Sequence, residues 1–86
     1  MLMRRKLGKL LSDPIEELYR DKWLDGIVLI ESDNWAAIKT RAAALMYIHR
    51  NDMNLHTTVK GNEIYILKQK DFMGSAKTFD LRERND

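Results

Sequence analysis

The sequence predicts one small α+β domain with the element order α-β-α-β-β, a three-stranded sheet and a C-terminal hairpin. Three observations support this fold class. A proline and two glutamates follow a Ser-Asp pair at the start of one helix, and "WAAIKTRAAALMYIHR" is rich in helix formers. In "HTTVKGNEIYIL", a Gly-Asn pair separates two β-branched, partly apolar runs. The length of 86 residues is that of a single domain.

We divide the chain into a basic amphipathic arm over residues 1–11, the α-β-α-β-β domain over 12–70 and a partly ordered C-terminal extension over 71–86. The arm has apolar residues at helical spacing, interrupted by Gly8, which weakens a free helix. We expect a docked or frayed terminus. An amphipathic helix and a partner-binding arm are the alternatives.

The first helix of the domain is predicted from Pro14 to Leu24. Proline is favoured at the first helical position, and the carboxylates of Glu16 and Glu17 suit the positive end of the helix dipole. Asp25-Gly26 ends the helix. Its expected apolar side consists of Ile15, Leu18, Tyr19 and Trp23.

Residues 26–31 are predicted to form a strand. Ile27-Val28-Leu29-Ile30 is apolar without alternation, which indicates burial on both faces. Because the two hairpin strands are neighbours, this strand is an edge of a three-stranded sheet. We expect one helix on each of its faces. Pairing with a second subunit through the free edge is the alternative.

A long helix is predicted over residues 34–51, capped by Ser32, Asp33 or Asn34. Projection at 100° per residue gives an expected buried side and an opposite, outward side. The expected buried side holds Ala42, Trp35, Met46, Ile38, Leu45, Ile48 and Ala37. The expected outward side holds Lys39, Arg50, Ala43, Ala36, Tyr47 and Thr40.

A hairpin is predicted over residues 55–68, with Gly61-Asn62 in a type II′ or I′ turn. This register pairs Lys60 with Glu63 and His56 with Leu67. Alternation then separates a core face from an outer face. The core face holds Leu55, Thr57, Val59, Ile64 and Ile66, and the outer face holds His56, Thr58, Lys60, Glu63, Tyr65 and Leu67. Beyond residue 70, "AKTFDLRE" is expected to form one or two helical turns, with Phe72, Phe79 and Leu81 available to dock.

Composition and charge restrict the function. There is no cysteine, the longest apolar run is too short to span a membrane, and the net charge is +2. Charge is segregated, because residues 1–11 and 34–70 are basic and 12–33 acidic. No phosphate loop, nucleophile motif or metal-ligand spacing is present, so we expect no enzyme, metal or cofactor. We expect a cytoplasmic protein.

The preferred hypothesis is a non-enzymatic binding protein that docks on another protein as a regulator or inhibitor. The expected contact residues come from the long helix and the outer hairpin face: Lys39, Ala43, Tyr47, Arg50, His56, Thr58, Lys60 and Tyr65. The second hypothesis is a DNA- or RNA-binding protein that uses the same surfaces, assisted by Arg4, Arg5, Lys6 and Lys9. The third is a structural homo-oligomer, such as a homodimer, built through the edge of the strand at 26–31.

The run "WAAIKTRAAALMYIHRNDMNLHTTVKGNEIYILK", residues 35–68, resembles short accessory proteins of tailed-phage genomes. Those proteins place an Arg-bearing, alanine-rich helix before a basic β-hairpin. The resemblance implies a small phage or mobile-element protein that binds a host component or nucleic acid in the host cytoplasm, and it transfers no catalytic residue. The acidic first helix is not part of that pattern.

Overall fold

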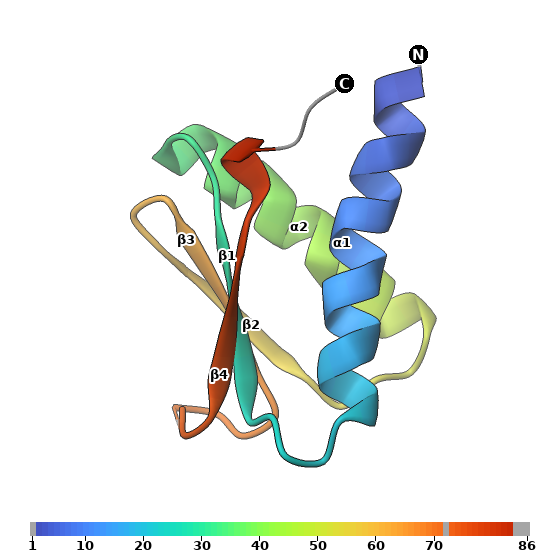
Figure 1. Cartoon of the computed structure of the whole chain (residues 1–86), viewed down its shortest axis with the longest axis vertical. Coiled ribbons are helices and arrows are strands. Elements are labelled where there is room, and N and C mark those ends of the chain that lie inside the picture. The colour runs from blue at the N-terminus through green and yellow to red at the C-terminus, as the bar shows by residue number, and fades with distance from the viewer. Residues whose placement is uncertain (1, 72, 84–86) are drawn as a thin grey trace.

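The computed structural model describes residues 2–71 and 73–83, and the side chains of residues 10–71 and 73–82. Two helices lie against one face of a four-stranded sheet (Figure 1). The elements, in chain order, are α1 (Leu2–Arg20), β1 (Gly26–Ile30), α2 (Asn34–Arg50), β2 (His56–Lys60), β3 (Glu63–Leu67), β4 (Ala76–Asp80) and a 3-10 turn, η1 (Leu81–Glu83). The α+β class is confirmed, whereas the predicted strand count is wrong.

Helix α1 continues through Pro14, although the sequence predicted a separate arm and a helix beginning at that proline. Leu11, Ile15 and Leu18 are buried at helical spacing on both sides of the proline, and Pro14 itself is buried. A proline inside a helix removes one backbone hydrogen bond and costs about 3 kcal/mol. Burial of this apolar stripe against the sheet offsets that cost.

The C-terminal end of α1 also differs from the expectation. The helix stops at Arg20, and the Asp21 Oδ1 atom accepts a hydrogen bond of 2.8 Å from the backbone N–H of Trp23. Such aspartate turns compete with helical hydrogen bonding. Trp23 lies beyond the helix and is 77% exposed, and Tyr19 within the helix is 50% exposed, so their predicted place on the apolar side is wrong.

Strand β1 lies inside the sheet, whose order is β2-β3-β1-β4. It pairs antiparallel with β3 and parallel with β4, so it has no free edge, and the premise of an oligomer built on that edge is removed. Ile27 and Leu29 face the two helices and are fully buried, while Val28 and Ile30 lie half-buried on the other face. The expectation of one helix on each face is therefore wrong.

Strand β4 and η1 replace the helical turns expected near the C-terminus. Phe79 packs on the core and Leu81 is buried, as the sequence suggested, whereas Phe72 lies outside the described residues. The Lys77 Nζ atom lies 2.7 Å from the Glu17 carboxylate of α1. The sequence of β4 has weak strand propensity. The segment nevertheless forms a strand, because it pairs with β1 and because two of the apolar side chains at this end of the chain pack on the core.

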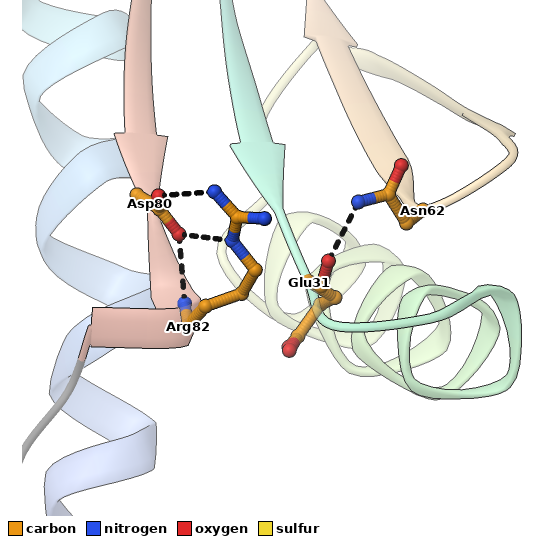
Figure 2. Close-up of polar contacts among 4 residues, drawn as sticks. All are labelled: Glu31, Asn62, Asp80 and Arg82. Atoms are coloured by element: carbon orange, nitrogen blue, oxygen red, sulfur yellow. Dashed lines mark hydrogen bonds and ion pairs between the residues drawn. The ribbon is translucent and has the colours of Figure 1, made fainter.

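The hairpin of β2 and β3 is confirmed, including all five predicted residue pairs. Ile64 and Ile66 are fully buried on the predicted core face. Gly61 has a φ of 61°, and Asn62 is not among the residues with positive φ, which makes the turn type II′. The Asn62 side chain donates a hydrogen bond of 2.8 Å to the backbone carbonyl of Glu31 (Figure 2), which ties the turn to the end of β1.

The side that helix α2 presents to the sheet overlaps the predicted side only in part. Ala37 and Ile48 are buried as predicted, and Ala44 and Thr40, which was expected outward, are buried with them. Trp35, Ile38, Ala42 and Met46 are exposed, so their predicted burial is wrong. The Asp33 side chain caps the helix by accepting a 2.8 Å hydrogen bond from the Ala36 N–H. Because this helix has apolar residues around its whole circumference, apolar spacing alone leaves its orientation ambiguous.

Ala44→Leu and Ala42→Leu form a matched pair that tests this orientation. Ala44→Leu should destabilise the fold by about 1–3 kcal/mol because it overpacks a closed interface. Ala42→Leu, on the exposed side, should change the free energy of unfolding by less than about 0.5 kcal/mol. Urea unfolding followed by circular dichroism measures both. The reverse ranking would restore the sequence-predicted side.

Candidate functional site

The outward side of α2 carries an apolar stripe formed by Trp35, Ile38, Ala42 and Met46. The three large side chains are 67%, 45% and 58% exposed for Trp35, Ile38 and Met46, respectively. Spacings of three and four residues align them along one side of the helix. We call these four residues the α2 stripe. Clustered exposed apolar side chains of this kind typically mark an interaction surface.

Basic groups border the α2 stripe. Lys39 and Arg50 are exposed, and the Lys39 Nζ atom lies 5.8 Å from the centre of the Trp35 ring. Residues 34–51 contain no aspartate or glutamate. The stripe is therefore apolar at its centre and positively charged along one border.

The four contact residues predicted on α2 occupy two environments. Lys39, Ala43 and Arg50 are exposed, as expected of surface residues. Tyr47 is half-buried, packs against the core and donates a short hydrogen bond from its hydroxyl to the Glu16 carboxylate of α1. Tyr47 thus joins the two helices, and the adjacent α2 stripe offers much more exposed apolar surface.

The hydrogen bond to Glu16 raises the pKa of Tyr47 above its ordinary value, and desolvation raises it further. The neutral phenol is therefore the form that the folded protein favours. Because folding raises this pKa, the contact between Tyr47 and Glu16 stabilises the fold fully below pH 10.0, the ordinary pKa of tyrosine. That stabilisation is lost as the pH rises from this value through the higher pKa of the folded state.

The predicted hairpin residues lie on the face of the sheet that the helices leave uncovered. His56, Thr58 and Lys60 are exposed along β2, and Tyr65 is half-buried on β3. Through its register β1 adds Val28 and Ile30, and β4 adds Thr78 and Asp80. This open face therefore has an apolar centre with polar groups around it.

Carboxylates occupy the end of the open face where Lys60 lies. Glu63 stands opposite Lys60 and accepts a 2.6 Å hydrogen bond from Tyr65, which raises the pKa of that tyrosine. Hydrogen bonds from Arg82 lower the pKa of Asp80 (Figure 2). Two carboxylates and an engaged tyrosine make this face poorly suited to a phosphate backbone.

A groove of about 570 Å³ lies along β2, next to α2 and the segment after β3. It is lined by Leu45, His49, Leu55, His56, Thr57, Thr58, Leu67, Lys70 and Asp71. We call it the β2 groove. It brings the two histidines of the chain to one place, which their spacing in sequence did not predict. Among the described residues, no group of three His, Asp or Glu side chains is arranged to hold a metal ion.

The structure thus brings only some of the predicted contact residues together. His56 and Thr58 line the β2 groove beside Leu45 and His49 of α2. At 100° per residue, Ala43 and Arg50 project more than a quarter turn from Leu45 around the helix, with the α2 stripe between them. The side chains of Arg4, Arg5, Lys6 and Lys9 lie outside the described side chains.

Comparison with protein-family models, curated proteins and solved structures finds no match to this chain. None of the helices in the described part of the chain combines the length and apolar character that crossing a membrane requires.

A titration of tyrosinate absorbance tests the contact between the helices. Tyr47→Phe should remove a component that ionises above pH 10.0 in the folded protein. Glu16→Gln should move that component to lower pH, because the carboxylate is the main cause of the raised pKa of Tyr47. Tyr19→Phe, on an exposed residue, serves as the control and should leave the component in place. An unchanged titration in Glu16→Gln would show that the hydrogen bond is absent.

Proposed function

We propose that this protein acts by binding another protein through the outward side of α2, as a regulator or inhibitor that masks part of its partner's surface. The α2 stripe carries this proposal. Its three large side chains are exposed together on one regular element, whereas Ala37, Thr40, Ala44 and Ile48 form the buried side of the same helix. Tryptophan and methionine supply much contact area, and tryptophan is enriched among residues that dominate binding energy.

The size of the apolar contribution supports a protein partner. Complete burial of one large apolar side chain is worth about 1.5–3 kcal/mol, and this stripe offers three that are already partly desolvated. The rigid helix positions them before binding, which lowers the entropic cost of association. A folded partner with a complementary apolar patch would bury them together.

The charge around the stripe indicates what the partner carries. With Lys39 and Arg50 along one border and no acid on the helix, the stripe favours a partner whose apolar patch has carboxylates on the matching side. Such charges mainly increase the association rate and fix the orientation. The affinity should therefore decrease only moderately with salt.

Nucleic-acid binding has less support from the geometry. Lys60 faces Glu63, Lys77 is paired with Glu17, and Arg82 is paired with Asp80. Affinity for nucleic acid grows with the number of phosphates neutralised, and these basic groups already lie beside carboxylates. The basic arm would have to supply most of the contacts.

Ile38→Glu/Met46→Glu tests the proposal, with Tyr19→Glu as the matched control on another exposed apolar residue. Proteins of the source cells that the immobilised wild type retains would be identified, purified and remeasured by titration calorimetry. The double variant should bind such a partner at least about tenfold more weakly, because it places two carboxylates in the apolar contact. The control should bind like the wild type.

Equal affinity of wild type and double variant for every purified partner would contradict the proposal. A salt titration against mixed-sequence DNA and RNA distinguishes the second hypothesis. Tight binding that weakens steeply with salt would favour nucleic acid as the target.

A further inference from the structure

We infer that the partner supplies an extended, acidic segment that adds to the free edge of β2 as a fifth strand and occupies the β2 groove. This inference rests on the proposed protein-binding function and specifies how the partner is held. Strand addition combines main-chain hydrogen bonds with side-chain contacts in a neighbouring groove. Three properties of the β2 edge support it: free backbone groups, an adjoining groove and an excess of basic groups.

The backbone of β2 has hydrogen-bonding groups that face away from the sheet. β2 is the first strand in the order β2-β3-β1-β4 and, within the described part of the chain, pairs only with β3. In a two-residue hairpin, the residues that flank the turn exchange both hydrogen bonds, and this pattern alternates along the strands. Lys60, Thr58 and His56 therefore bond to β3. Thr57 and Val59 direct their N–H and C=O groups outward.

Arg41 supports this assignment independently. Its Nη2 atom lies 3.4 Å from the backbone oxygen of Thr57, as a long hydrogen bond. A carbonyl engaged with β3 would point away from this side chain. The long distance also means that a better-placed N–H donor from an added strand could replace Arg41.

The β2 groove provides space for side chains of the added strand. Its walls include the apolar side chains of Leu45 and Leu55 together with His49 of α2. Thr57 also lines the groove, and its hydroxyl oxygen is buried without a hydrogen-bond partner among the described residues.

The charge of this region selects an acidic occupant. Lys70 lines the groove together with one acid, Asp71, while Arg41 lies at the edge itself and Lys60 stands opposite Glu63. The opposite edge of the sheet differs, because Lys77 on β4 already pairs with Glu17. Arg41 beside the β2 edge contacts a backbone carbonyl rather than a carboxylate, so this edge favours an acidic strand more than the β4 edge does.

A second copy of this chain is a poorer occupant than an acidic segment. Pairing β2 with β2 of another copy would bring two α2 helices close together. Each carries Lys39, Arg41 and Arg50 without any acid between residues 34 and 51. Like charges placed together across an interface are unfavourable. An acidic strand gains from the same charges.

Hydrogen exchange measured by NMR tests the inference on the intact protein. The probe is a short synthetic peptide of alternating glutamate and valine, and the matched control replaces each glutamate by lysine. In the free protein, the Thr57 and Val59 amides should exchange much faster than those of Thr58 and Lys60. The acidic peptide should slow exchange at Thr57 and Val59, whereas the basic peptide should leave it unchanged.

Two further changes isolate the main-chain contact. N-methylation of alternate amides removes the donors on one edge of the peptide while its charge remains. Two such peptides are possible, one methylated at the odd-numbered and one at the even-numbered amides. One of them should bind about tenfold or more weakly, because several backbone hydrogen bonds to β2 are lost. Val59→Pro removes an outward N–H and should have a similar effect. Val59→Thr keeps that N–H at nearly the same volume and should bind like the wild type.

The outcomes distinguish this inference from the protein-binding proposal. If a purified partner depends on the α2 stripe but leaves Thr57 and Val59 exchange unchanged, strand addition is wrong and docking on α2 stands. If neither the partner nor the acidic peptide protects the two amides, the inference also fails. Equal binding of wild type and Ile38→Glu/Met46→Glu to every partner removes the proposed function on which the inference rests.

Discussion

The hydrogen bond between the Thr40 hydroxyl and the Glu31 carboxylate determines how the rest of this fold is arranged. Glu31 is only 2% exposed, and Thr40 Oγ1 donates to it at 2.5 Å. A buried carboxylate is costly unless hydrogen bonds satisfy it, so α2 must turn Thr40 toward the end of β1. The same rotation places Ala37 and Ala44 against the sheet and the bulky side chains of α2 outside.

This rotation produces the surfaces that we assign to binding. Ala37 and Ala44 on the buried side let the helix lie close to β2 and β3, and Trp35, Ile38 and Met46 remain exposed on the other side. It also directs Arg41 and Leu45 toward the free edge of β2, where Arg41 contacts the backbone oxygen of Thr57 and Leu45 lines the groove. The α2 stripe and the β2 groove are thus two consequences of one packing arrangement, and a single partner could contact both.

The sequence predicted the local features well and the non-local ones poorly. The hairpin register was predictable because the Gly61-Asn62 turn and the alternation of apolar residues lie within a few positions of each other. Pro14 misled the prediction, because burial on both sides of it outweighs its helix-breaking effect. The rotation of α2 depends on Glu31, whose burial has no local signal. β4 depends on pairing with a strand fifty residues earlier in the chain.

The most direct test of this account is the accessibility of Trp35. Trp23→Phe leaves Trp35 as the single tryptophan, and its fluorescence quenching by acrylamide would be measured in dilute native and urea-unfolded protein. If α2 turns its bulky side outward, native quenching should approach that of the unfolded chain, with little change in emission wavelength on unfolding. Strong protection from acrylamide and a blue-shifted native emission would contradict the orientation of α2 and the function proposed from it.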